Sequence, residues 1–220
     1  MSASRKRPAK KRSAAQARAK SRSAASFARG AGQRAASAAA PEPVYELKRP
    51  VFLVGFMGAG KTSVARKLAR MAKVASVDMD TYIERRENKR VKDIFAEVGE
   101  DGFRAIETEV LYELGCKDPM LVSCGGGVVL REENRRALSE LGFTVYLQVT
   151  AKEAASRISD VSTRPLFGDL ENAQRVIDSR LPLYEEVADA TVNTIGRGST
   201  SIAYEVLDIL KKEGILWQRK

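Results

Sequence analysis

Histidine is absent from all 220 residues of the sequence. Its absence excludes Ser-His and Cys-His nucleophilic mechanisms, His-ligated zinc and a histidine general base. Cysteine is scarce as well: Cys116 and Cys124 are too few for a disulfide framework or a metal site, and they are typical of a reducing compartment. Any catalysis therefore depends on Asp, Glu, Lys, Arg and a bound metal ion.

Long hydrophobic runs are missing too. No stretch of eighteen apolar residues occurs, so we expect no transmembrane helix. The positively charged start is not followed by the apolar core of a signal peptide, which argues against secretion. We therefore expect a cytoplasmic protein that does not associate with a membrane.

Acidic residues are nearly absent from the first 43 residues, where Glu42 stands against eleven Lys and Arg. The rest of the chain carries 27 basic and 27 acidic residues, so the net charge of +10 describes the start alone. This start also lacks large apolar residues and cannot bury enough surface to offset its chain entropy. We expect residues 1–46 to be a disordered basic tail and residues 47–220 to form the folded domain, without a nucleic-acid groove.

Several functions remain open for this tail. Its Arg- and Ser-rich, acid-poor composition is typical of organelle transit peptides, which would place the protein in a plastid. A polybasic arm would instead bind polyanions weakly. A solubilising extension without a specific partner explains the composition equally well.

A short apolar run and a glycine-rich loop open the neutral part of the chain. Val51–Val54 predicts a buried strand, residues 64–71 predict an amphipathic helix, and between them GxxxxGKT at residues 55–62 matches the phosphate-loop pattern. Glycines let successive N–H groups converge on phosphate oxygens, and the helix N-terminus adds positive potential. Lys61 would pair with the β- and γ-phosphates and the Thr62 hydroxyl would bind Mg²⁺. The sequence predicts a nucleotide site, and a chance glycine turn before a lysine is the alternative.

Further apolar runs alternate with helical patterns along the chain. Strands followed by helices predict a parallel sheet covered on both faces, which is a three-layer α/β/α fold. Pro182 is expected to interrupt a helix, and the polar residues 159–169 are expected to form a mobile active-site loop. The predicted strands are 51–54, 74–77, 120–123, 143–149 and 190–193; the predicted helices after 64–71 are 91–98, 101–114, 131–141, 151–158, 172–187 and 199–212.

Acids and glycines follow the second and third predicted strands. Asp78 and Asp80 come after the second strand and the glycines 125–127 after the third. Ligands gather at the carboxyl ends of parallel strands, so we expect both groups at the site. The alternatives are that Asp80 caps a helix and that the glycines are a flexible turn. Arg104 and Glu107 lie three residues apart on one predicted helix, close enough to pair.

Six motifs of this sequence, in content and in order, resemble those of the shikimate kinase family. Its members are small P-loop kinases related to the nucleoside monophosphate kinases. The resemblance covers residues 50–212 and leaves the tail outside. It implies the P-loop kinase fold with a lid at about 158–170, and ATP- and Mg²⁺-dependent phosphorylation of the 3-hydroxyl of shikimate by a monomer, a step of aromatic amino acid biosynthesis. The motifs are GFMGAGKT (55–62), DMD (78–80), GFRAIE (102–107), SCGGG (123–127), TRPLF (163–167) and SRLPLYEEVA (179–188).

For the nucleotide, the resemblance implies that Thr62 binds Mg²⁺ directly and Asp78 binds it through water. Arg164, on the lid, would reach the transferring phosphate and act catalytically together with Lys61. The positions implied to contact ATP are Gly58, Ala59, Gly60, Lys61, Thr62, Ser63, Arg157, Arg164 and Arg197.

For the acceptor, the resemblance implies that Asp80 holds the ring hydroxyls and acts as the base. Arg104 and Arg180 would bind the carboxylate, and the backbone at Gly126 would bind a hydroxyl. Two guanidinium groups facing one carboxylate suit the polarity of shikimate, which has an acid at one end and hydroxyls at the other.

Other P-loop proteins are the alternatives. A gluconate or nucleotide kinase shares the loop, but the two arginines with Asp80 favour a carboxylated polyol. A GTPase would need an Asn/Thr-Lys-x-Asp segment after a strand, which the sequence lacks. The neutral domain argues against a nucleic-acid-binding switch that uses the tail. Ser199 departs from the family where some members have proline, which bears on the adenine contact.

Overall fold

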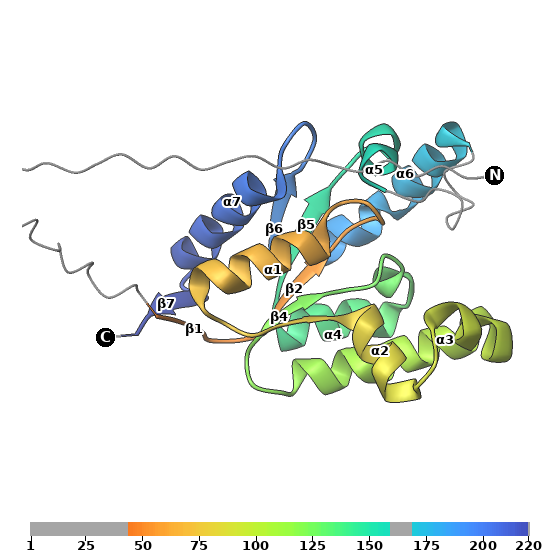
Figure 1. The fold of residues 1–220 in the computed structure, drawn as a ribbon, viewed down its shortest axis with the longest axis horizontal. Helices are drawn as coiled ribbons and strands as arrows, with labels where there is room; N and C mark the ends of the chain where they lie inside the picture. The colour runs from red at the N-terminus through yellow and green to blue at the C-terminus, as the bar shows by residue number, and fades with distance from the viewer. Residues whose placement is uncertain (1–43, 159–168, 220) are drawn as a thin grey trace, which may run out of the picture. The chain divides into compact units, whose positions relative to one another are not determined.

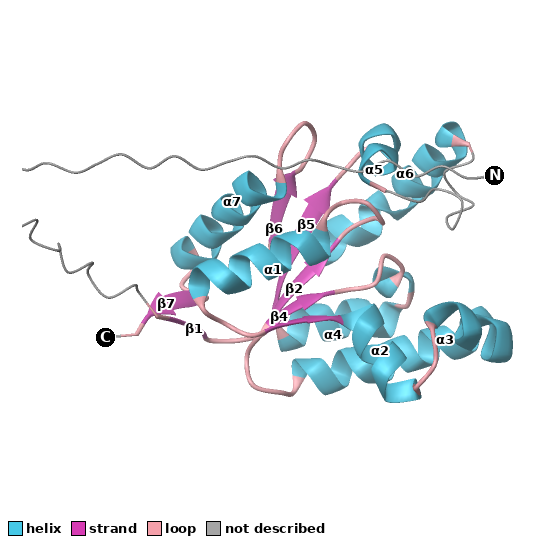
Figure 2. Ribbon diagram, in the orientation of Figure 1, coloured by secondary structure: helices cyan, strands magenta, loops and turns pink. Residues whose placement is uncertain are grey.

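Five parallel strands form one sheet in the order β3-β4-β2-β5-β6 (Figure 2). The structure, a computed structural model, describes residues 44–158 and 169–219. β2 lies at the centre, with β4 paired on one side and β5 on the other. The five-stranded parallel sheet predicted from the sequence is thereby confirmed. Its strands are β2 (Val51–Val54), β3 (Ser76–Asp78), β4 (Leu121–Ser123), β5 (Phe143–Gln148) and β6 (Ala190–Asn193).

Helices cover both faces of this sheet. α1 packs against α7 on one face, and α3 packs against α4 on the other (Figure 1). The result is the predicted three-layer α/β/α architecture. The helices are α1 (Lys61–Ala72), α2 (Met79–Glu87), α3 (Val91–Gly115), α4 (Glu132–Leu141), α5 (Ala151–Arg157), α6 (Leu170–Val187) and α7 (Ser199–Lys212), with a short 3₁₀ helix η1 (Val128–Leu130).

The central strand β2 explains why the sheet needs two helical layers. All four of its residues are buried. Successive side chains on a strand point to opposite faces, so Val51 and Leu53 join the apolar cluster of α1 and α7. Phe52 and Val54 join the cluster of α3, α4 and α6 on the other face. The unbroken apolar run in the sequence is therefore the pattern of a strand buried on both sides.

The helical region after residue 91 bends at Gly99. The sequence predicts two helices here, and the structure has one element, α3, whose residue Gly99 has φ 69° and ψ −174° inside it. This backbone conformation is essentially restricted to glycine. The two predicted helices are therefore the two arms of a kinked helix.

Pro182 does not interrupt α6, so that prediction is wrong. The helix runs from Leu170 to Val187 with Pro182 inside it. Proline removes one helical hydrogen bond, but Tyr184 and Val187, which follow it, are buried in the apolar cluster around α3 and α4. Packing on this side holds the helix together across the proline.

A second, two-stranded sheet was not predicted. β1 (Tyr45–Leu47) pairs antiparallel with β7 (Leu216–Gln218), and Leu47 and Leu216 are both buried. β1 begins at Tyr45, two residues before the domain start expected at residue 47. The local sequence hides this strand, since three residues have no visible period and their partner lies at the other end of the chain.

Parts of two expectations lie outside the described residues. They are the tail before residue 44 and the segment 159–168, which contains Arg164 and most of the expected lid. None of the helices in the described ranges combines the length and the apolar composition that a bilayer crossing requires.

Candidate active site

The phosphate loop connects β2 to α1 and depends on its glycines. Gly55, Gly58 and Gly60 all have positive φ. A Cβ atom at Gly58 would lie 2.7 Å from the carbonyl oxygen of Ala154, and one at Gly55 would lie 2.5 Å from that of Leu147. The loop therefore curls against β5 and α5 at a distance that only glycine permits.

Lys61 begins α1 and is buried, with 9% of its surface exposed. Its Nζ donates hydrogen bonds to the carbonyl oxygens of Gly55 at 2.7 Å and Phe56 at 3.0 Å. These bonds hold the ammonium group inside the curl of the loop. A positive charge is thus fixed beside the backbone N–H groups that suit phosphate.

A hydroxyl and a carboxylate meet at the carboxyl ends of β3 and β4. The Thr62 hydroxyl donates to Asp78 Oδ2 at 2.7 Å and lies 3.1 Å from the Ser123 hydroxyl. The register of the sheet places Asp78 directly beside Ser123. Burial opposes the charge of Asp78, but hydrogen bonds from Thr62, Thr81 and Ser123 outweigh it and lower its pKa. An ionised carboxylate among hydroxyls beside a phosphate loop is an oxygen donor set that fits Mg²⁺.

Ser123 is a site residue that the sequence reasoning missed. It is the first residue of the SCGGG motif, but the motif itself does not indicate a role for it. The available signal was its place at the last position of β4, next to the central strand.

Asp78 also caps a helix, the role that the sequence offered as an alternative for Asp80. It caps α2, because its side chain accepts a hydrogen bond from the Thr81 backbone N–H at 3.1 Å.

The three glycines after β4 have neighbours in three directions, and two of them, Gly125 and Gly127, have no room for a side chain. A Cβ at Gly125 would lie 2.5 Å from Glu107 Oε1 and 3.1 Å from Asp80 Oδ1. One at Gly126 would lie 3.4 Å from the Met57 backbone nitrogen, and one at Gly127 would overlap the Arg104 guanidinium. The segment is therefore packed against its neighbours, in contrast to the flexible turn that was the alternative. Its small residues allow the phosphate loop, α2 and α3 to approach one another.

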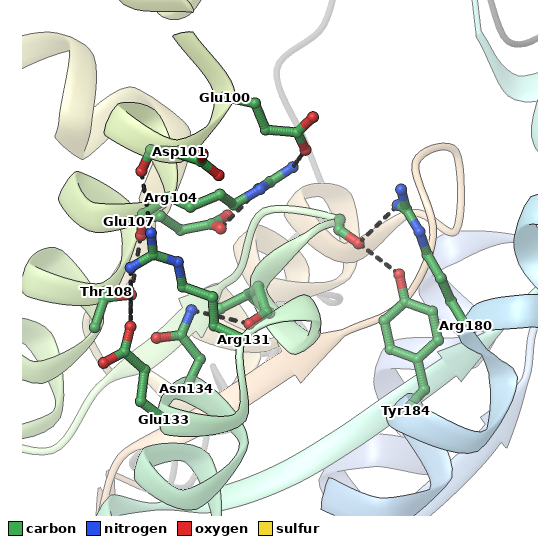
Figure 3. Close-up of polar contacts among 12 residues, drawn as sticks. Glu100, Asp101, Arg104, Glu107, Thr108, Arg131, Glu133, Asn134, Arg180 and Tyr184 are labelled. Atoms are coloured by element: carbon green, nitrogen blue, oxygen red, sulfur yellow. Dashed lines mark hydrogen bonds and ion pairs between the residues drawn. The ribbon is translucent and has the colours of Figure 1, made fainter. Parts of the chain in front are cut away.

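Arg104 pairs with Glu107 on α3, as its spacing predicts. Arg104 Nη1 donates to Glu107 Oε2 at 2.7 Å, and Nη2 donates to Glu100 at 3.3 Å (Figure 3). Glu107 is completely buried, and burial raises its pKa while the Arg104 guanidinium opposes the shift. Within the described residues, Arg104 Nε and Glu107 Oε1 have no hydrogen-bond partner. Glu107 therefore orients the Arg104 guanidinium. The sequence spacing predicted that the two residues pair but not that the pair has this orienting role.

Arg180 approaches the same glycines from α6. Its Nη1 lies 3.5 Å from the Gly126 carbonyl oxygen, and its guanidinium lies 5.9 Å from the centre of the Phe56 ring. Figure 3 shows Arg180 and Tyr184 reaching this carbonyl side by side, with Arg104 on the other side of the segment. The two arginines predicted to share one ligand thus flank one glycine segment.

Arg157 contacts the phosphate loop, and Arg197 lies at the end of β6. Arg157 donates to the Thr194 hydroxyl at 3.0 Å and to the carbonyl oxygen of Ala59 at 3.4 Å. Arg197 donates to the Asn193 carbonyl oxygen at 3.0 Å and forms an ion pair with Glu205. Both guanidinium groups are held by the protein at the edge of the site.

One cavity of about 520 Å³ joins most of the predicted residues. Arg104 and Arg180 are not among its lining residues, although both reach the glycines that are next to it. Ala59 is completely buried and contributes backbone only. The predicted residues that line the cavity are Gly58, Gly60, Lys61, Thr62, Ser63, Asp78, Asp80, Gly126, Arg157 and Arg197.

A parallel sheet, a phosphate loop at the end of its central strand and an adjacent hydroxyl–carboxylate pair define a P-loop kinase. The model of the family "Shikimate kinase" matches residues 57–211. This chain is 41% identical over 167 residues to a shikimate kinase of Actinobacillus succinogenes, covering 74% of this chain and 95% of that protein. A shikimate kinase of Pasteurella multocida is 38% identical with the same coverage.

Solved structures agree with this result. The shikimate kinase from Acinetobacter baumannii in complex with shikimate has a TM-score of 0.68 and 34% identity, covering 75% of this chain and 94% of that one. The shikimate kinase from Aquifex aeolicus has a TM-score of 0.67 and 29% identity, covering 76% and 98%. The chain belongs to the shikimate kinase family. It is an enzyme that uses ATP and Mg²⁺ to phosphorylate shikimate.

Proposed function

We propose that this enzyme transfers the γ-phosphoryl group of ATP to the 3-hydroxyl of shikimate across the cavity between the phosphate loop and the glycine segment 125–127. The observation that carries the proposal is this juxtaposition. Lys61, Thr62 and Asp80 line the same cavity, and two arginines reach its glycine wall from opposite sides. Phosphate donors and acceptor groups are therefore within reach of one another.

On the nucleotide side, the loop N–H groups and Lys61 bind the phosphates. Thr62 would hold Mg²⁺ directly and Asp78 would support it through water, while Ser123 positions the Thr62 hydroxyl. When bound there, Mg²⁺ would supply positive charge beside the phosphates. The Lys61 ammonium is already oriented by the carbonyl groups of the loop, so little reorganisation is needed when charge develops in the transition state.

On the acceptor side, Arg104 and Arg180 bind the carboxylate and Asp80 binds the ring hydroxyls. The acceptor oxygen attacks the γ-phosphorus as its proton passes to a carboxylate oxygen of Asp80. The bond between that phosphorus and the β,γ-bridging oxygen breaks, and ADP leaves. The backbone at Gly126 binds a further hydroxyl. Glu107 contributes indirectly, because its ion pair fixes the direction of the Arg104 guanidinium.

Three roles stay predictions that the family resemblance implies. Arg164 belongs to the expected lid at 158–170 and would offset charge on the transferring phosphate, but it lies outside the described residues. Arg157 and Arg197 are proposed to bind the adenine side of ATP. Their place at the rim of the cavity supports that role.

We also propose that the catalytic domain begins near Val44 and works as a cytoplasmic monomer. The basic start of the chain then stays outside the reaction and binds polyanions only weakly. Both cysteines are free thiols, with Cys116 exposed and Cys124 buried, which supports a reducing compartment. Gel filtration of the full chain tests the monomer, since a dimer would elute at twice the mass of 24.1 kDa.

A coupled assay of ADP release tests the function. The purified full chain is given ATP, Mg²⁺ and, separately, shikimate, gluconate and nucleoside monophosphates. Turnover is expected with shikimate alone, and chelation of Mg²⁺ is expected to stop it. Preferred turnover of gluconate or a nucleotide would refute the proposed acceptor site, and NMR of the product identifies the hydroxyl that is phosphorylated.

A further inference from the structure

Tyr184 is a buried residue of α6 to which the proposed chemistry gives no task. Its side chain is completely buried, and its ring stacks on Tyr146 of β5 with centroids 5.0 Å apart and an angle of 8° between the planes. Its hydroxyl donates a hydrogen bond of 2.6 Å to the carbonyl oxygen of Gly126. Burial raises the pKa of Tyr184, although Arg180 opposes the shift, so the hydroxyl keeps its proton and remains a donor.

The Gly126 carbonyl is shared between Tyr184 and Arg180. Arg180 lies four residues before Tyr184, so both side chains leave the same face of α6 one turn apart (Figure 3). The Arg180 contact, at 3.5 Å, is the longer of the two. The Tyr184 hydroxyl is therefore the stronger restraint on this carbonyl.

The orientation of this carbonyl also sets the orientation of the next backbone N–H. A peptide unit is planar and trans, so the C=O of Gly126 and the N–H of Gly127 point in opposite directions. A hydroxyl that holds the carbonyl toward α6 turns that N–H away from α6. Glycine offers no side chain to resist rotation, so an external hydrogen bond is what fixes this peptide.

We propose that Tyr184 is a positioning residue for the acceptor: through the Gly126 carbonyl it fixes both the Gly126–Gly127 peptide and the Arg180 guanidinium. This inference rests on the proposed function, in which Gly126 and Arg180 bind the acceptor. Tyr184 itself touches neither substrate nor the reacting atoms. Its effect belongs to the acceptor half of the site and leaves the phosphate loop unchanged.

The test compares Tyr184→Phe with Tyr146→Phe in the full chain. Each variant removes one hydroxyl from the same stacked pair, but within the described residues the Tyr146 hydroxyl makes no hydrogen bond, which makes it the matched control. In Tyr184→Phe we expect the KM for shikimate to rise about tenfold, the factor that corresponds to one lost hydrogen bond. The KM for ATP is expected to stay within about twofold of the wild type, and Tyr146→Phe is expected to leave both KM values unchanged.

Thermal melts of both variants determine the assay temperature, which is set where both variants are fully folded. A change in stability then does not affect the KM values that are compared. An unchanged KM for shikimate in Tyr184→Phe would overturn the proposal, as would an equal rise in both KM values. If the wild type itself does not phosphorylate shikimate, the proposed function fails independently of these variants.

A double-mutant cycle with Arg180→Lys tests the shared carbonyl. If both residues act through Gly126, the loss in kcat/KM for shikimate in the double variant is smaller than the product of the two single losses. Multiplicative losses would show that Tyr184 and Arg180 act independently, which contradicts the proposed coupling.

Discussion

Asp78 and Asp80 line the cavity, and Glu107 is buried against Gly125 of the glycine segment, so the surroundings of these three carboxylates differ. Asp78 accepts hydrogen bonds from two threonines. Glu107 is buried against Arg104. Asp80 lies in the first turn of α2, is exposed and lines the cavity. Of the three, Asp80 is the one that is both exposed and part of the cavity lining, which supports its proposed role as the base.

Replacing Asp80 by asparagine removes the proposed base while keeping the shape of the side chain. We expect kcat for shikimate in Asp80→Asn to fall by about 10²- to 10⁴-fold, the usual contribution of a general base. ATP binding, measured by calorimetry, is expected to stay near the wild-type value. The control is Asp93→Asn, an exposed acid in the first turn of α3. Substantial turnover in Asp80→Asn would assign the base elsewhere.

The lowered pKa of Asp78 predicts a dependence of stability on pH. Since the folded state binds its proton less tightly than the unfolded state does, Asp78 stabilises the fold above its unfolded pKa, and this contribution is lost as pH falls through the folded pKa. The difference in unfolding free energy between wild type and Asp78→Asn should be constant above about pH 5 and shrink below about pH 4. Urea titrations across this range measure it, and a difference that grows in acid would contradict the prediction.

At the scale of the element, α3 shows how one glycine shapes the helix that carries Arg104 and Glu107. The kink at Gly99 separates the first turns of α3 from the arm that carries Arg104 and Glu107. The arm can therefore follow its own direction along the glycine segment. The space around Gly99 is open, with no atom within 4 Å of a Cβ built there, so the need for glycine comes from the backbone conformation alone.

A substitution at Gly99 therefore tests the backbone conformation without introducing a steric clash. Gly99→Ala should lower the free energy of unfolding by about 1–3 kcal/mol, because alanine is strained in this backbone conformation. Lys92→Ala, at an exposed position of the same helix, should change it by less than about 0.5 kcal/mol. Urea denaturation measures both variants. Equal stability of Gly99→Ala and wild type would mean that the kink relaxes without penalty.

At the scale of the whole molecule, the two ends of the described domain close on each other. β1 and β7 form their own sheet, and Lys211 of α7 lies 4.8 Å from the centre of the Tyr45 ring. Leu47 and Leu216 belong to the apolar cluster of α1 and α7. The start of the domain thus stabilises the helical layer behind the phosphate loop.

Two truncations separate the basic start from this strand. A chain beginning at Pro43 is expected to keep the stability and the kinetic constants of the full chain. A chain beginning at Arg49 loses β1 and the burial of Leu47, and its unfolding free energy should fall by about 2–3 kcal/mol. Thermal melts and the coupled assay measure both. A large loss of activity in the Pro43 chain would show that the basic start is part of the enzyme.

Much of the site could be predicted from the sequence because its signals are local. The GxxxxGKT loop, the acids at the end of β3 and the glycines after β4 each lie at or within a few residues of a strand. Period and spacing determine strands, helices and the i,i+3 pair of Arg104 with Glu107. The carboxyl ends of parallel strands then meet at one edge, which brings these segments together.

The tertiary structure alone decided which side chains face one another. Strand register places Ser123 beside Asp78, packing carries α6 across Pro182 and turns Tyr184 toward Gly126, and residues at opposite ends of the chain pair as β1 and β7. None of these has a local pattern. Each depends on contacts between segments that are distant in sequence, and those contacts contribute free energy only when the core has closed. The sequence therefore determined which chemical groups are available, and the packing determined their geometry.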